Sequence, residues 1–447
     1  MIKDKNFYKT FFRLMIALMC QQAVVLSVNL IDNVMLGNYS ESALSGVAAV
    51  NMIQFILQQL VYGAGNAMAV FISQYYAKRE LLSIKKITAI ALRLCVILSF
   101  IIFIIVSLFP NEILSIFSED ELIVSEGTSY MMIVRFTYVI FAITTVFLSL
   151  MRAVEKVSIS LVVSLISLGI NSLINYLLIF GNCGMPRLGV EGAAIGTLVA
   201  RIVEFIIVLF YIFKKDKIIS LKLGDLFLRD PLLLKDYYKA GFPMILGGIL
   251  WGLNNSLQTI LMGHLSSNAI AAYSISSTEF LFLKVATVGA ASASQVMIAK
   301  AVGTDDIDMV KAYTRTMQVL YLIIGAILFS IMYFSRFLLL SMYRLSAETT
   351  SLAISFIVIE SVILGTNTYH MCMNNGIIIG GGNTRYMTIL DIVFIWFIAL
   401  PASFIAAFKF NADPVIILIL LNLDQPLKCI PAVFYGNSYK WIHKLAR

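Results

Sequence analysis

The sequence predicts an all-α polytopic membrane protein with twelve transmembrane helices in two pseudo-symmetric bundles of six. The first observation is composition: 60% of the 447 residues are hydrophobic and 13% are charged, with a mean hydropathy of +0.90. A water-soluble core with its polar shell is less apolar than this. The second is a series of apolar segments that reach the ~20 residues needed to cross the hydrocarbon as a helix. The third is a regular alternation of positive charge between these segments.

Twelve apolar segments follow one another along the chain. Membrane β-barrels show short alternating segments instead of unbroken apolar runs, which excludes a barrel. The first segment is too long for a signal peptide and has no small-residue cleavage site, so it counts as a helix. The predicted spans are 11–36, 46–73, 87–109, 128–150, 157–181, 190–213, 241–262, 269–299, 315–340, 351–379, 386–409 and 413–436.

Lys and Arg concentrate on one side of the predicted bundle. The two tails and the even-numbered connections hold about 24 of the 33 Lys and Arg residues, and the odd-numbered connections hold about three. We therefore expect both termini in the cytoplasm of a cell-membrane protein. The net charge of +8 follows from this topology, so no nucleic-acid partner is expected.

A basic connection at 214–239 separates two similar halves, 1–213 and 240–447. The segment DNVMLGNYSESALSG at 32–46 matches QTILMGHLSSNAIAA at 258–272, and MRAVEKVSISLVVS from 151 matches IGGGNTRYMTILDI from 379. Each half holds six spans, an even number, so the halves run in the same direction and are related by an axis along the membrane normal. Parallel repeats of this kind are typical of transporters.

Three helices of the N-terminal half have polar faces. Hydrocarbon disfavours such faces, so we expect them to line one cavity. The residues are Gln22, Asn29 and Asp32 on the first helix, Asn51, Gln54, Gln58 and Tyr62 on the second, and Asn171 and Asn175 on the fifth. The alternative for Asp32 is exposure at the outer interface, because it lies about five residues from the outer end of its helix, or ~7.5 Å of rise.

An intramembrane carboxylate has a specific chemical use. Withdrawal of a carboxyl group from water favours its protonated form, so it can take up and release a proton nearer to neutral pH. The same oxygens, with Asn carbonyls beside them, could instead hold Na⁺. The residues alone leave H⁺ and Na⁺ both open as the ion that Asp32, Asn171 and Asn175 would bind.

The C-terminal half offers mainly neutral polar groups. Gln258 is the repeat partner of Asp32 and lies with Asn254 on the seventh span. Glu279 on the eighth span and Asn367 on the tenth are further candidates for a cavity wall, with a structural role as the alternative for Glu279.

Two sets of intramembrane charges suggest ion pairs. Arg135 is the repeat counterpart of Glu360, so a pair between the halves, with a gating role, is one possibility. Arg201 and Glu204 are three residues apart on one helix face, and a local structural ion pair is expected there. The same is expected for Asp424 and Lys428.

These features resemble the MATE (multidrug and toxic compound extrusion) transporters of bacterial type, in the MOP flippase superfamily. The resemblance covers essentially the whole chain and rests on IDNVMLG in the first helix, NYLLIFGNCGMPRLGVEGAAIGT at 175–197, and the paired turns MRAVEK and IGGGNTR. It implies that Asp32 is the carboxylate on which the coupling cation and the substrate compete. One bacterial branch also uses an acidic residue on the seventh helix, which is absent from GILWGLNNSLQTILMG here.

The resemblance implies a secondary antiporter that exports amphipathic or cationic compounds in exchange for H⁺ or Na⁺, works as a monomer and needs no other cofactor. A lipid-linked oligosaccharide flippase of the same superfamily is the alternative; it predicts several cationic residues in the cavity. An enzyme is not expected. With three histidines, two of them outside the spans, a catalytic zinc site would lack ligands, and GIIIGGGNTR at 376–385 does not match a P-loop.

Overall fold

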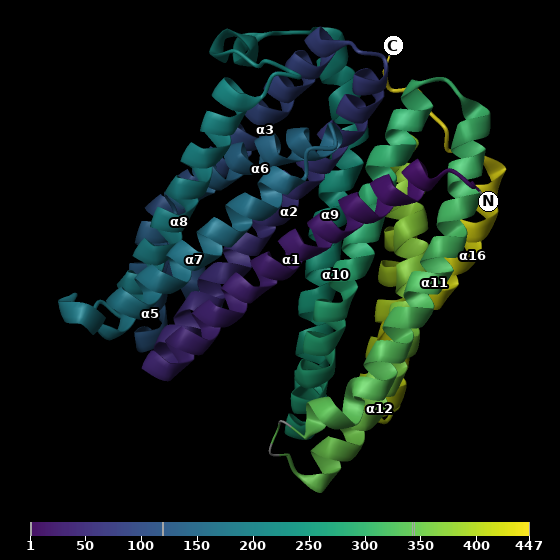
Figure 1. Cartoon of the computed structure of the whole chain (residues 1–447). Helices are drawn as coiled ribbons and strands as arrows, with labels where there is room; N and C mark the ends of the chain where they lie inside the picture. Colours follow the sequence, from purple (N-terminus) through teal and green to yellow (C-terminus); the bar gives the residue numbers. More distant parts are fainter. Residues whose placement is uncertain (1, 119, 342, 344, 447) are drawn as a thin grey trace. The chain divides into compact units, whose positions relative to one another are not determined.

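The computed structural model describes residues 2–118, 120–341, 343 and 345–446, and these residues form an almost entirely helical structure (Figure 1). Short turns connect the helices, and an isolated bridge joins Gly382 to Ile442. The helices are α1 (Lys5–Tyr39), α2 (Glu41–Ala77), α3 (Leu81–Leu108), α4 (Pro110–Ser115), α5 (Glu121–Val134), α6 (Thr137–Ala153), α7 (Ser158–Phe180), α8 (Val190–Phe210), α9 (Pro231–Leu265), α10 (Ser267–Gly303), α11 (Ile307–Leu340), α12 (Ala347–Met371), α13 (Arg385–Asp391), α14 (Leu400–Phe408), α15 (Pro414–Leu421) and α16 (Asp424–Ser438).

The predicted fold class is confirmed: the described chain is all-α and spans a membrane. In it, ten helical stretches are long and apolar enough to cross, and the bent pair α5 and α6, with 52° between its parts, makes an eleventh. α9 corresponds to the seventh predicted span. It is 35 residues long, as α1 is, but Asn254, Asn255 and Gln258 lower its hydropathy below that of the other spans. Three spans contain π-helical turns, at Tyr211–Lys215, Cys372–Ile378 and Ile392–Ala399.

The backbone repeats the internal similarity that the sequence predicts. α1 and α9 have equal lengths, as do α2 and α10. Ser40 caps α2 by accepting a hydrogen bond from the N–H of Ala43, and Ser266 caps α10 by the same bond from Ala269. The two halves therefore share helix lengths and cap chemistry at matching positions.

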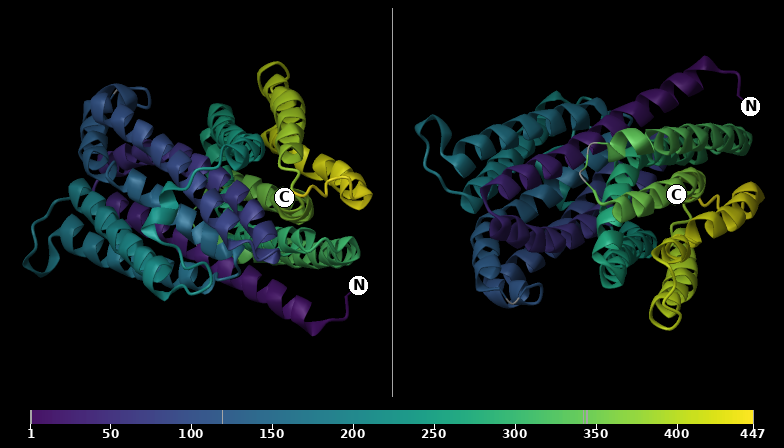
Figure 2. Two further views of the ribbon diagram at one scale, coloured as in Figure 1. Left: turned by 90° about the horizontal axis from the view of Figure 1, so that it is seen from above. Right: turned by 90° about the horizontal axis from the view of Figure 1, so that it is seen from below.

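By its internal contacts the chain divides into two compact units. Unit 2 is Cys20–Ile245, and unit 1 consists of Met1–Met19 with Leu246–Arg447. The sequence places the division at the 214–239 connection, whereas both unit boundaries fall inside the long helices α1 and α9. Figure 2 shows the end of unit 1 in yellow-green and yellow, where α14 and α15 form a hairpin.

The basic connection between the halves is docked on unit 2. Lys85 and Lys86 of α3 bind Asp225 at 2.8 Å and Asp230 at 3.0 Å, and Lys156 binds Asp216 at 2.7 Å. The N–H of Leu233 and the ammonium of Lys86 keep the pKa of Asp230 below its ordinary value. α9 begins at Pro231, so it takes up the last part of the segment predicted as a linker.

Glycines allow close helix contact in both units, and the contact between α11 and α12 offers a direct test. A Cβ added at Gly325 would lie 2.9 Å from the carbonyl oxygen of Gly365, whereas one added at Gly365 would lie 3.6 Å from the nearest atom. We expect Gly325→Ala to destabilise the protein by about 1–3 kcal/mol, the usual effect of overpacking. Thermal unfolding in detergent measures it.

The matched control is Gly365→Ala, which adds the same methyl group to the other side of the same contact. Its expected effect on the unfolding temperature is small. Equal shifts for the two variants would contradict this account of how α11 and α12 pack.

Candidate functional site

A cavity of about 370 Å³ lies within unit 2. This volume falls in the range of small-molecule sites. Its wall is built from α1, α2, α6, α7 and α8, with Tyr130 of α5. Hydroxyl, amide and charged groups alternate in it with apolar side chains such as Val25, Phe55 and Phe141. The cavity could thus hold a compound that is partly apolar and partly polar.

Asp32 stands in the cavity wall at one end of a hydrogen-bonded chain. The side-chain amide of Asn175 donates to Asp32 Oδ1 at 2.6 Å and also lies 3.4 Å from Asn171 Oδ1. Asn171 in turn donates to the hydroxyl of Thr197 at 3.4 Å. Asn171 and Asn175 are both buried, so side chains with little exposure to water orient the carboxylate.

Gly196 fixes the position of Asn175. The Cα of this glycine on α8 lies so close to the side-chain oxygen of Asn175 that an added Cβ would be 2.1 Å from Oδ1. That oxygen is buried and has no hydrogen-bond partner among the described residues. With Gly196 leaving room behind it, the amide presents its N–H to Asp32.

The cavity wall also contains two arginines, which the sequence did not place there. Arg152, in the last turn of α6, lines the wall and donates from Nη2 to Asn66 Oδ1 at 2.6 Å. Arg201 lines the wall too, but its guanidinium is paired with Glu204 at 2.8 Å and lies over the ring of Phe141. The polar residues that the sequence places in this wall are neutral or acidic, and the structure adds two basic ones to them.

Most residues predicted for the N-terminal cavity lie in its wall. Those in the wall are Asn29, Asp32, Asn51, Gln54, Gln58, Tyr62 and Asn171. Arg201 and Glu204, which were predicted as an ion pair, line it as well. Asn175 stands behind it. Gln22 is not among the described residues that line the cavity, whereas its neighbour Gln21 is. Both lie on α1, which also contributes Val24, Val25, Val28, Asn29, Asp32 and Asn33 to the wall.

Sequence reasoning missed several wall residues besides Arg152. Ser160, Ser164 and Ser167 precede Asn171 on α7 at spacings of three and four, so the polar face of this helix is longer than the two asparagines. This spacing was a usable signal. Thr197 also shares a face of α8 with Arg201 and Glu204, which follow it by four and seven residues, and Tyr130 follows Glu126 of α5 by four.

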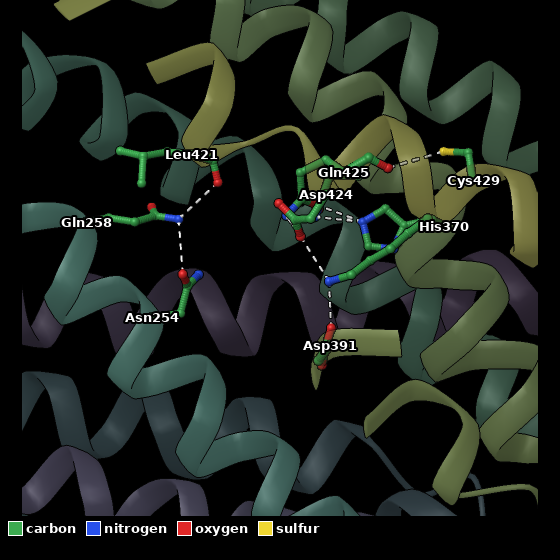
Figure 3. A network of polar contacts seen from close by, with 10 residues as sticks. Asn254, Gln258, His370, Asp391, Leu421, Asp424, Gln425 and Cys429 are labelled. Carbon is green, nitrogen blue, oxygen red and sulfur yellow. Dashed lines mark hydrogen bonds and ion pairs between the residues drawn. The ribbon is translucent and has the colours of Figure 1, made fainter. Parts of the chain in front are cut away.

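The candidates of the C-terminal half lie in unit 1. The side-chain amide of Gln258 donates to Asn254 Oδ1 at 3.5 Å on α9 (Figure 3). The Tyr273 hydroxyl donates to Gln258 at 3.2 Å. Glu279 accepts a hydrogen bond of 2.5 Å from Ser335, and Glu360 is buried. Whether these residues face a substrate stays a prediction, as does the pairing of Arg135 with Glu360. The Arg135 guanidinium lies over the rings of Phe103 and Phe136.

Unit 1 contains a buried charged cluster that the sequence showed only in part. Lys428 binds Asp424 at 2.9 Å, as its spacing predicts, and also Asp391 of α13 at 2.6 Å. Gln425 connects this triad to His370 of α12, accepting at 2.7 Å from the ring and donating to Asp424 at 2.8 Å (Figure 3). Because α12, α13 and α16 each supply a member, the cluster ties three helices together.

Removing the cation from this cluster should cost stability. Lys428→Gln leaves two buried carboxylates without their counter-charge, and breaking a buried pair in this way is destabilising by about 3–5 kcal/mol. We expect a clear fall in the unfolding temperature in detergent. Lys444→Gln is the control, since the Lys444–Asp305 pair is 53% and 52% exposed and should contribute little.

A second variant separates loss of charge balance from loss of packing. Neutralising both acids as well, in Lys428→Met with Asp391→Asn and Asp424→Asn, should recover much of the lost stability. Equal unfolding temperatures for Lys428→Gln and Lys444→Gln would overturn the structural role of the triad.

A helical membrane protein made of two similar bundles, with an acidic group in the wall of an internal polar cavity, has the architecture of a membrane transporter. The sequence profile of the MatE family matches residues 17–177 and 243–405, once in each half. The chain belongs to the MatE family, which confirms the resemblance found in the sequence. The separation of the two matches is also that of the internal repeat.

Relatives and solved structures agree with this assignment. The chain is 24% identical over 374 residues to the "Probable multidrug resistance protein YoeA" of Bacillus subtilis (strain 168), covering 81% of this chain and 79% of that protein. It is 24% identical over 410 residues to the "Probable multidrug resistance protein NorM" of Bacillus cereus, covering 91% and 89%.

The fold matches that of a solved multidrug resistance MATE family transporter of the MOP superfamily in an outward-facing conformation. The TM-score is 0.85, at 18% identity, over 96% of this chain and 95% of that one. A structure of MATE in complex with MaL6 gives a TM-score of 0.88 at 17% identity, with the same coverage. At this identity the likeness establishes the fold alone.

Proposed function

We propose that this protein is a secondary active antiporter that exports amphipathic compounds, cationic and aromatic ones among them, in exchange for H⁺ or Na⁺. The observation that carries the proposal is Asp32 in the wall of the unit 2 cavity, held at 2.6 Å by Asn175. The names of the relatives as multidrug resistance proteins support the substrate class.

In this proposal Asp32 is the site that ion and substrate share. An ionised Asp32 attracts a cationic compound, and binding of H⁺ or Na⁺ cancels that attraction, so the two ligands exclude each other. Exchange requires that ion and compound favour different conformations of the transporter, because only a difference in affinity shifts the equilibrium between them. The energy of the H⁺ or Na⁺ gradient then drives export of the compound.

A lipid-linked oligosaccharide flippase is the second candidate. Arg152 and Arg201 in the cavity wall favour it, since a pyrophosphate group needs cationic partners. The Arg201–Glu204 ion pair weighs against it, because it leaves Arg152 as the cavity arginine without a carboxylate partner among the described residues. Drug export is therefore the function that the cavity supports better.

The test is transport by purified protein in liposomes. A pH gradient and a Na⁺ gradient are imposed in separate experiments, each in both directions. Movement of ethidium, a planar aromatic cation, is followed by fluorescence. We expect one of the two gradients to drive ethidium movement against its own gradient, which identifies the ion. Ethidium movement under neither gradient, with lipid-linked sugar scrambling instead, would replace the antiporter by the flippase.

We also propose that the protein functions as a monomer in the cell membrane, with both termini in the cytoplasm. The distribution of Lys and Arg supports this orientation. Cys183, which is free and exposed between α7 and α8, should then face the outside. We expect a membrane-impermeant maleimide to label intact cells that express the wild type and not Cys183→Ser. Labelling only after cell lysis would reverse the orientation.

A further inference from the structure

The unit 2 cavity contains an arginine whose charge the protein leaves uncompensated. Arg152 has one recorded side-chain partner, the neutral amide of Asn66, and its Nε is buried without a hydrogen bond among the described residues. The other charged side chains in this wall have partners: Arg201 and Glu204 form an ion pair, and Asp32 accepts a hydrogen bond from Asn175. An unpaired guanidinium in a membrane protein is costly, and such residues usually face a ligand path.

The surroundings of Arg152 suit an anionic oxygen group. Ser149 and Ser160, together with Ser164, line the same part of the cavity, where α6 ends and α7 begins. Their hydroxyls can donate to an anion, and a guanidinium can bind a carboxylate or a phosphate through two parallel hydrogen bonds. No acidic side chain of the described lining competes there, since Asp32 lies at the Asn175 end and Glu204 is occupied by Arg201.

We propose that Arg152 is an anion-binding subsite, so that the cavity accepts amphoteric compounds whose carboxylate binds Arg152. The inference rests on the proposed export function and narrows its substrate class. A carboxylate fits better than a pyrophosphate because Arg152 offers one unpaired positive charge. A cation-only compound would leave Arg152 unused.

The experiment uses two dyes that differ in one group. Rhodamine 110 carries a free carboxylate, and rhodamine 123 is its methyl ester, with the same cationic ring system. Binding of each to the full-length detergent-solubilised protein is measured by fluorescence anisotropy. We expect Arg152→Gln to raise the Kd of rhodamine 110 at least about tenfold, consistent with a hydrogen bond to a charged group, and the Kd of rhodamine 123 less than about twofold.

Arg93→Gln is the matched control. Arg93 is a half-buried arginine of the same unit that donates to the backbone oxygens of Ala89 and Leu228 and is not part of the described lining. The Arg93→Gln variant should bind both dyes with the Kd values of the wild type. Arg152→Lys should retain part of the rhodamine 110 affinity, because lysine keeps the positive charge but cannot form two parallel hydrogen bonds to the carboxylate.

The outcomes separate the inference from the proposed function. If Arg152→Gln weakens both dyes equally or neither, Arg152 only ties α6 to Asn66 of α2, and the inference fails while export stands. If the wild type binds neither dye but gradients drive ethidium transport, the inference fails and export stands; if ethidium transport is absent as well, both fail. Farnesyl pyrophosphate is added as a competitor. If its inhibition constant is lower than the Kd of rhodamine 110, and if Arg152→Gln abolishes this competition, the subsite binds a lipid pyrophosphate. The amphoteric class is then overturned.

Discussion

Asp32→Asn is expected to abolish gradient-driven export while leaving the protein folded. Asparagine has nearly the same shape as aspartate and can still accept the hydrogen bond from Asn175, which is 2.6 Å away. It cannot bind a proton or offer a negative charge, so ion and substrate no longer compete. We expect the rate of ethidium movement under the driving gradient to fall at least about a hundredfold, to the level of liposomes without protein, because the charge-dependent step is removed.

Two controls define this result. Glu41→Gln removes an exposed carboxylate from the first turn of α2, close to Asp32 in sequence, and should transport like the wild type. Thermal unfolding of Asp32→Asn in detergent should remain within a few degrees of wild type. Gradient-driven ethidium transport by Asp32→Asn at the wild-type rate would show that Asp32 is a structural polar residue.

Gly196→Ala is expected to damage transport nearly as strongly without changing any ionisable group. The new methyl group would lie 2.1 Å from the side-chain oxygen of Asn175, which must then move. Asn175 is fully buried, so its amide cannot shift without breaking the bond to Asp32. Loss of a hydrogen bond to a charged group typically costs about 1.5–3 kcal/mol, which corresponds to at least a tenfold loss of ion affinity and of coupled transport.

The control is Gly169→Ala on α7, the helix that carries Asn175. A Cβ at Gly169 would have no atom within 4 Å, so the substitution should be tolerated. The affinity for H⁺ or Na⁺ can be followed by the ion concentration that gives half-maximal ethidium transport. If Gly196→Ala left this concentration unchanged, Asn175 would not be the residue that positions Asp32.

The transmembrane fold was predictable because the membrane imposes a strong local rule. A helix that crosses hydrocarbon must be long and apolar, so each span is recognisable in the sequence as a long apolar run, except where function adds polar groups. α9 shows the limit: Asn254, Asn255 and Gln258 lower its hydropathy, and the repeat and the charge alternation placed it instead.

The polar wall was predictable where several polar residues shared a helix face. Asn51, Gln54 and Gln58 recur on α2 with helical spacing, and all three line the cavity. Gln22 shows that such spacing identifies the face but not every member of the wall, because the packing of the neighbouring helices decides which side chains reach the cavity.

What the sequence by itself determined is the all-α membrane fold, the repeat and the polar faces of the N-terminal helices that include Asp32, since each depends on local composition or spacing. The tertiary structure alone decided which groups meet. Asn175 bonds to Asp32 across two helices, Asp391 joins Lys428 from another helix, and Arg152 lies in the cavity without a carboxylate partner among the described residues. Contacts of this kind depend on how helices far apart in the chain pack together, and no local pattern in the sequence encodes them.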